Sequence, residues 1–107
     1  MRQIEQREAK IIKFLARIGG VKITVPDHQL VWVVNPQMRS IRAKYCPRGY
    51  RVFSVASHQF DDNDGVPIIA TLLLTEDGQF GELDFWKVND EPILGLPYIN
   101  GTFMRVA

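Results

Sequence analysis

Two carboxylates, Glu82 and Asp84, stand two residues apart in a segment with the composition of a β-strand, FGELDFWKV. Side chains at positions i and i+2 of a strand point to the same face, with about 6.6 Å between their backbone positions. Glycoside hydrolases use a pair of carboxyl groups near this separation for acid–base chemistry. One interpretation is therefore a hydrolase in which Glu82 and Asp84 form the catalytic pair.

A second interpretation of the two acids needs no substrate. A chain of 107 residues can bury one core but has little room for a substrate groove as well. Arg42 with Lys44, or Arg51, would lie opposite the carboxylates on a neighbouring strand, and each such pair contributes about 0.2–1 kcal/mol. We favour this interpretation and predict no catalytic residues.

An aromatic pair follows the two acids. Phe85 and Trp86 are adjacent, so their side chains point to opposite faces of the strand. One of them must point away from a helix-covered core, and an exposed Trp commonly anchors an interface. We predict a partner-binding surface formed by Glu82, Asp84, Trp86 and Asp90. The alternative is that Trp86 belongs to the core.

The charges are segregated along the chain, although the net charge is only +1. Residues 28–60 contain five basic and no acidic side chains, whereas residues 61–91 contain nine acidic side chains and Lys87 as the single base. Either the fold interleaves the two signs as cross-strand pairs, or it keeps them apart as a dipolar surface that steers a charged partner.

The basic segment supports an alternative function, the binding of nucleic acid or of a small ligand. Its cations alternate with aromatic residues, a composition typical of nucleic-acid surfaces. The cations are Arg39, Arg42, Lys44, Arg48 and Arg51. However, the isoelectric point is 7.9, whereas a dedicated nucleic-acid module usually lies above about 9. We therefore rank nucleic acid behind a protein partner.

The order of the expected elements defines the fold class. Apolar residues recur at helical spacing over residues 3–18, and Gly19 and Gly20 end the helix. Asp77-Gly78 between two apolar runs predicts a hairpin. Extended runs are expected at residues 21–25, 30–34, 38–45, 50–60, 66–74 and 79–88, with a further short strand at 102–106. We predict one α+β domain over residues 1–107, with an N-terminal amphipathic helix packed on a mostly antiparallel sheet of five to six strands.

The apolar run at residues 66–74 predicts how the sheet is covered. Ile68-Ile69 and Leu72-Leu73-Leu74 are apolar on both faces, which is typical of a central strand. The helix would cover one face. We expect the C-terminal segment after residue 91, or a second protomer in a homodimer, to cover the other.

Residues 61–97, DDNDGVPIIATLLLTEDGQFGELDFWKVNDEPILGLP, resemble a family of small bacterial proteins classed as a domain of unknown function. The matching positions are Asp64, Gly65, Val66, Pro67, Asp77, Gly78, Glu82, Leu83, Asp84, Phe85, Trp86, Lys87 and Pro97. The family's glycine-rich stretch before the third strand is not reproduced here. The resemblance implies a helix-plus-sheet fold and a bacterial source, and it carries no established activity.

These observations together predict a non-catalytic protein-binding module. Small proteins of this size and architecture resemble, by analogy, immunity proteins that neutralise polymorphic toxins. The acidic hairpin 75–91 and Trp86 would then meet a basic surface of the partner, such as a toxin, and occlude it.

Cofactors, metals and membranes are not expected. Cys46 is the only cysteine, and His28 and His58 have no ligand pattern around them. No apolar run approaches the ~20 residues that span a bilayer. The charged N-terminus lacks the apolar centre of a secretory signal, so we expect a cytoplasmic location.

Overall fold

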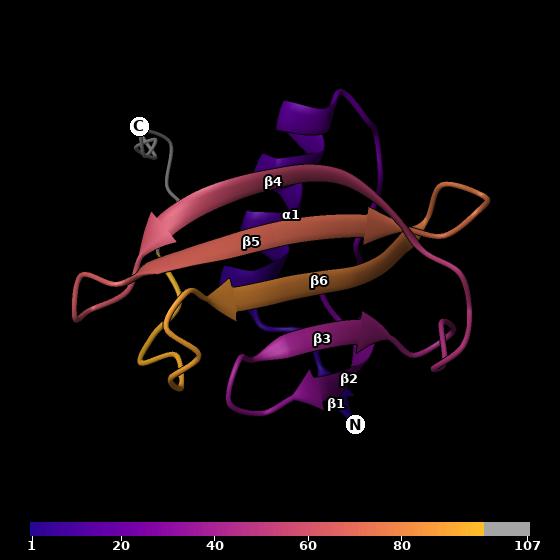
Figure 1. Ribbon diagram of the computed structural model, residues 1–107. Coiled ribbons are helices and arrows are strands. Elements are labelled where there is room, and N and C mark those ends of the chain that lie inside the picture. The colour runs from indigo at the N-terminus through magenta and orange to yellow at the C-terminus, as the bar shows by residue number, and fades with distance from the viewer. Residues whose placement is uncertain (98–107) are drawn as a thin grey trace.

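The computed structural model describes residues 1–97, which form one helix and a six-stranded antiparallel sheet (Figure 1). The elements are β1 (Arg2–Gln3), α1 (Gln6–Gly19), β2 (Leu30–Asn35), β3 (Ser40–Ala43), β4 (Phe53–Asp61), β5 (Pro67–Leu74) and β6 (Phe80–Lys87). The strand order is β1-β2-β3-β6-β5-β4. The predicted α+β class, with its N-terminal helix and antiparallel sheet, is confirmed.

Helix α1 crosses behind the sheet in Figure 1 and contacts β4 and β5. Its apolar stripe of Ile11, Ile12 and Leu15 is completely buried. The helix begins at Gln6, later than predicted, because Arg2 pairs with β2 and the chain turns at Glu5. Gly20 ends it in the left-handed conformation, with φ 69°, which glycine adopts without steric cost.

The prediction of a strand at residues 21–25 is wrong. Its alternation is real, because Val21, Ile23 and Val25 pack on the core while Lys22 and Thr24 are exposed. However, this segment returns alongside α1 from the end of the helix to β2, and no strand lies beside it (Figure 1). Without a neighbour there is no hydrogen-bonded ladder.

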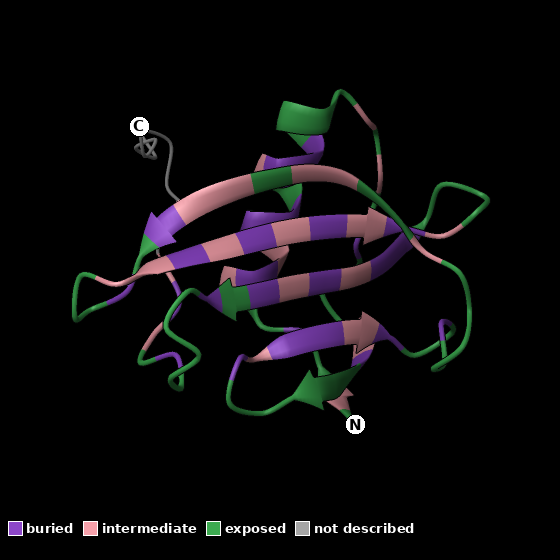
Figure 2. Cartoon of the chain, in the orientation of Figure 1, coloured by how far each residue is buried: buried purple, intermediate pink, exposed green. Residues whose placement is uncertain are grey.

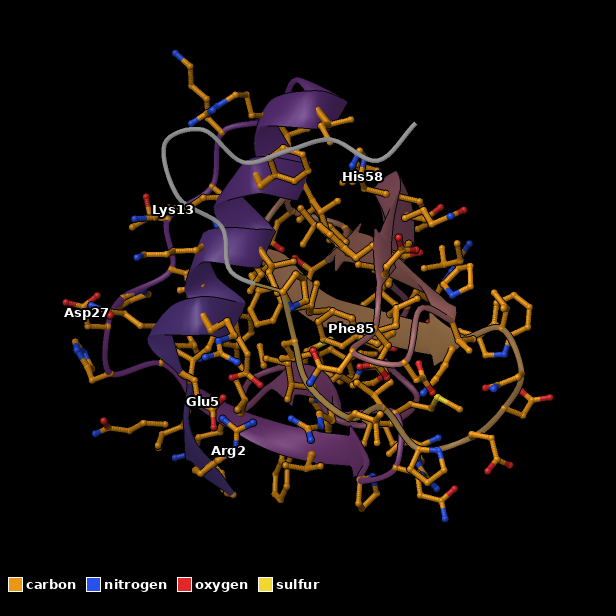
Figure 3. All side chains as sticks on the ribbon, turned by 90° about the vertical axis from the view of Figure 1, so that its left-hand side faces the viewer. Arg2, Glu5, Lys13, Asp27, His58 and Phe85 are labelled. Atoms are coloured by element: carbon orange, nitrogen blue, oxygen red, sulfur yellow. The ribbon has the colours of Figure 1, made fainter. Side chains whose placement is uncertain are left out.

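The sheet has one covered and one open side. Figure 2 shows buried positions alternating with partly exposed ones along β5 and β6. Figure 3 views the molecule from the side and shows Phe85 between the sheet and α1. We call the opposite side, which carries Trp32, Ser40, Arg42, Glu82, Asp84 and Trp86, the open face. Strand β5 lies between β6 and β4 and is therefore an interior strand. It is not the central strand that we predicted.

We expected the segment after residue 91 to cover the open face, and the described part of it, up to residue 97, does not. The remainder lies outside the described residues. Residues 88–97 close one end of the layer between helix and sheet, where Ile93 and Leu96 are buried. The Ile93 amide donates to the Gln37 carbonyl over 2.9 Å, and Arg7 donates to the Leu96 carbonyl over 3.2 Å. Within residues 1–97 no element covers the open face. The short strand predicted at 102–106 lies outside the described residues.

Candidate functional site

An ion pair occupies the middle of the open face. Strands β3 and β6 place Arg42 opposite Glu82, and Arg42 Nε lies 3.3 Å from Glu82 Oε1. The side chains are only 13% and 17% exposed. Arg42 Nε makes no hydrogen bond within the described residues, so the contact is electrostatic, while Nη2 donates to the Tyr50 carbonyl over 2.8 Å. The basic segment and the acidic segment are therefore interleaved at this point.

Asp84 lies on the same face without a cation. Its Oδ1 accepts a hydrogen bond of 3.0 Å from the Ser40 hydroxyl, because Ser40 is the β3 residue opposite it. The pairing with a basic residue that we expected is not formed within residues 1–97. The ladder from Thr71↔Asp84 to Ala70↔Phe85 is continuous, so no bulge turns either acid away from the other.

Burial sets the electrostatics of these two carboxylates. It raises the pKa of Glu82 above its usual value, against the opposing charge of Arg42 and with help from Asp84. It also raises the pKa of Asp84, and the hydrogen bond from Ser40 offsets this only in part. A raised carboxyl pKa means that the folded protein disfavours the ionised form. Both charges are therefore held on the open face at some cost in stability.

Trp86 stands next to Asp84 on this face and is 46% exposed. Its indole Nε1 donates to Asp90 Oδ1 over 2.8 Å. Asp90 follows the end of β6 in a left-handed conformation, with φ 62°, and turns its carboxylate back to the ring. The structure thus brings together all four residues predicted for partner binding, with the orientation of the indole fixed.

Trp32, on β2, is a second exposed aromatic side chain on the open face. It is 41% exposed and lies opposite Arg42 in the β2–β3 ladder. Its Nε1 points to the Lys44 carbonyl at 3.4 Å. The alternation of LVWVV predicts that this side chain points outward, but the sequence interpretation did not use that signal. Trp32 therefore flanks the Arg42–Glu82 pair across the sheet, whereas Trp86 lies four residues from Glu82 along β6.

A catalytic interpretation of the acids finds no partner group in residues 1–97. Glu82 and Asp84 line none of the three grooves that can be described. His58 points from β4 to the helix side (Figure 3), edge-on to Phe14 at a centroid distance of 5.0 Å. His28 lines a separate groove beside Pro26. Neither histidine is near the two carboxylates to act as their acid or base.

The five cations predicted for nucleic-acid binding are dispersed. Arg42 is occupied by Glu82 and Tyr50. Arg39, left-handed with φ 64°, donates to the Leu94 carbonyl over 3.1 Å. Arg51 lies over the Phe53 ring, 5.3 Å from its centroid.

The remaining two cations, Lys44 and Arg48, line different grooves. Lys44 is exposed beside His28. Arg48 is exposed beside Trp32. Of the five cations, Arg42 and Arg48 share one groove, whereas Lys44 and Arg51 line two others.

The sequence interpretation missed a buried ionic cluster around Lys87, the last residue of β6. Lys87 Nζ is 2.9 Å from Asp62 Oδ2 and 2.7 Å from Asp64 Oδ2. The Lys87 side chain is 1% exposed and the Asp62 side chain 0%. We call this group the Lys87 cluster. It was recognisable, because Lys87 continues the apolar face of Leu83 and Phe85 and a buried lysine needs a counter-charge, which the acidic turn 61–64 supplies.

Asp62 also fixes the chain that follows β6. Its carboxylate accepts hydrogen bonds from the amides of Leu94, at 2.8 Å, and Gly95, at 3.1 Å. Burial on its own would raise the pKa of Asp62, but the bonds from Lys87 and the backbone amides outweigh it and lower the pKa. The bond from Lys87 likewise lowers the pKa of Asp64. Ionisation of these carboxylates therefore stabilises the fold.

The described residues contain neither a metal-binding group nor a membrane-spanning helix. No group of three or more His, Cys, Asp or Glu side chains in residues 1–97 is arranged to hold a metal ion. Helix α1 is too short and too polar to cross a membrane, and it is the single helix in the part that the structure describes.

Residues 1–97 form a small α+β domain in which the described chain leaves one face of the sheet uncovered. Residues 1–97 match the family described as "Domain of unknown function (DUF6984)", and the chain belongs to this family. The resemblance noted for residues 61–97 thus extends over the whole described chain. No curated protein and no solved structure matches it. Of the resemblance positions, Asp64 and Lys87 belong to the Lys87 cluster, whereas Glu82, Asp84 and Trp86 lie on the open face.

Proposed function

We propose that this protein is a non-catalytic protein-binding module whose open face meets a basic surface of its partner. The observation that carries the proposal is Asp84, a partly buried carboxylate that no cation of residues 1–97 pairs with, beside the half-exposed Trp86. A charge that is kept on a surface at a cost to folding is typical of a functional position. A cationic side chain of the partner would supply the missing counter-charge.

The composition of the face supports a protein partner. Aromatic and Arg side chains are enriched in protein interfaces, and an anchored Trp is a frequent hot spot. Trp86 is held by Asp90, so little side-chain entropy is lost when a partner packs against it. The most concrete form of this function is an immunity-type inhibitor of a bacterial toxin, which occludes the toxin's basic surface with the hairpin 75–91.

Charge reversal on the open face tests the proposal. The tagged protein is used to isolate a partner from its source cells, and the affinity for the purified partner is then measured by calorimetry. Asp84→Lys and Trp86→Ala should each weaken binding by about 2 kcal/mol, roughly thirtyfold in Kd. Asp27→Lys is the matched control, because Asp27 lies beyond α1 on the far side from the sheet (Figure 3).

Three outcomes would contradict the proposal. One is a partner whose affinity is unchanged by both open-face variants. The second is an equal loss with Asp27→Lys, which would indicate a general charge effect. The third is capture of nucleic acid with an affinity that falls steeply with added salt, the behaviour expected of phosphate binding.

A further inference from the structure

A groove of about 320 Å³ lies at the β2 side of the open face. It is lined by Trp32, Val33, Val34, Arg42, Pro47 and Arg48. Its volume is at the lower limit of small-molecule sites, which are about 300–1,000 Å³. The space suits one or two side chains of a partner better than a large ligand.

The walls of the groove combine an apolar surface with positive charge. Trp32 is oriented by its contact with the Lys44 carbonyl, and the two valines and the proline extend the apolar wall. Arg42 is already engaged by Glu82 and Tyr50. Arg48 is exposed and has no hydrogen bond or ion pair to any residue in 1–97, so its guanidinium is available to bind a carboxylate in a two-pronged geometry.

We infer that this groove binds an acidic side chain of the partner, Asp or Glu, together with a neighbouring apolar side chain. The carboxylate lies against Arg48 and the apolar group against Trp32. This inference deepens the proposed function and rests on it, because it assigns the chemistry of one part of the same interface. The open face is then complementary to a partner that presents an acid at the groove and a base near Asp84.

The neighbouring charges favour a single carboxylate over the phosphates of a nucleic acid. Glu82 lies one strand beyond Arg42, and adjacent strands are about 5 Å apart. The charge of Glu82 is therefore within the screening length of Arg42, which is about 8 Å at physiological salt. Asp84 and Asp90 continue the negative charge along β6. A run of phosphates that leaves the groove across the sheet would be repelled, whereas one side-chain carboxylate stays beside the arginines.

Defined peptides test the groove directly by NMR of the full-length protein. Acetyl-Leu-Glu-amide and acetyl-Leu-Gln-amide have the same shape and differ in charge. The glutamate peptide should shift the indole N–H resonance of Trp32 and leave that of Trp86 unchanged. Its Kd should be about tenfold lower than that of the glutamine peptide, as expected for a charge-assisted hydrogen bond.

Two variants separate recognition by Arg48 from general attraction. Arg48→Gln should remove the preference for the glutamate peptide, and it leaves the fold intact because the side chain is exposed in a loop. Lys44→Gln is the matched control, since Lys44 is exposed nearby but lines a different groove, and it should keep the preference.

The inference is overturned by an unshifted Trp32, by equal affinity for the two peptides, or by an equal loss in both variants. A short oligothymidylate that binds at Trp32 more tightly than the glutamate peptide would overturn it in favour of nucleic acid. These failures leave the contribution of Asp84 and Trp86 to partner binding open to the calorimetric test. Conversely, an unaffected Asp84→Lys affinity would refute the proposed function even if the peptides bind.

Discussion

Strand β6 carries charged side chains on both of its faces, and the two faces differ in how far these charges are buried and paired. On the helix side, Lys87 is enclosed with Asp62 and Asp64, and the backbone amides of Leu94 and Gly95 complete the shell. On the open face, Glu82 and Asp84 are partly buried. Arg42 lies opposite Glu82, and Asp84 accepts a hydrogen bond from Ser40. Residues 82–87 therefore alternate between groups that build the fold and groups that face outward.

The pKa shifts show the difference between the two regions most directly. The pKa of Asp62 and Asp64 is lowered, so their ionisation contributes to stability. The pKa of Glu82 and Asp84 is raised by burial, so their ionisation opposes folding. A carboxylate whose ionisation stabilises the fold has a structural role, whereas one whose ionisation opposes folding is a candidate functional position.

The largest expected effect comes from breaking the Lys87 cluster. Asp62→Ala leaves Lys87 with the more exposed Asp64 and the Pro92 carbonyl, and it removes the acceptor for the Leu94 and Gly95 amides. Loss of one partner of a buried ion pair should lower the free energy of unfolding by about 3 kcal/mol. Urea unfolding followed by circular dichroism measures it. A loss below about 1 kcal/mol would mean that the cluster behaves like a surface ion pair.

Acidification should separate the two regions by sign. The lowered pKa of Asp62 and Asp64 gives stability that is complete above the ordinary Asp value of 3.8 and is lost as the pH falls through the folded pKa. The raised pKa of Glu82 and Asp84 has the opposite effect, because protonation there removes a penalty. Below about pH 4 the urea midpoint should fall, and it should fall less steeply in Asp64→Asn. As the pH falls from the raised pKa of Asp84 to the ordinary Asp value of 3.8, the unmodified protein should gain stability, and Asp84→Asn should lack this gain. Parallel pH profiles for the two variants would contradict the assignment.

The elements that could be predicted from the sequence are those that local signals specify. Helix α1 and the β5–β6 hairpin follow from local signals, namely apolar spacing, a glycine stop and the Asp77-Gly78 turn, where Gly78 has φ 83°. Residues 21–25 show the limit of such signals, because alternation marks a half-buried segment and a strand also needs a neighbour.

The charge pairing depends on register between distant segments, which local sequence does not specify. Arg42 was among the expected partners of the acids, and it does lie opposite Glu82. The antiparallel register that makes this pair also places Ser40 opposite Asp84. A single-sequence argument about charge could not find a hydroxyl partner, and it therefore missed that Asp84 pairs with Ser40 and with no cation of residues 1–97.

A smaller effect is expected from the ion pair on the open face. Arg42→Met leaves Glu82 partly buried without its cation and should lower the free energy of unfolding by about 1 kcal/mol, less than in the Lys87 cluster because solvent still reaches the pair. The double variant Arg42→Met/Glu82→Met should recover most of this loss, because a packed apolar pair commonly replaces an ion pair at no cost. Additive losses in the double variant would show that Arg42 stabilises the fold through the Tyr50 carbonyl instead.

The smallest effect on stability is expected from Asp84→Asn, which tests directly whether the open face differs from the Lys87 cluster. Asp84→Asn keeps an oxygen that accepts the Ser40 hydrogen bond and removes the disfavoured charge. Because Asp84 is only partly buried, the variant should be more stable at neutral pH by a few tenths of a kcal/mol, and the gain should vanish below the pKa of the carboxyl group. Urea midpoints at pH 7 and pH 3 measure both quantities. If the same variant also weakens partner binding, the charge is retained for recognition at the expense of stability; if Asp84→Asn instead destabilises the protein at neutral pH, the ionised Asp84 belongs with Asp62 and Asp64 among the groups that build the fold.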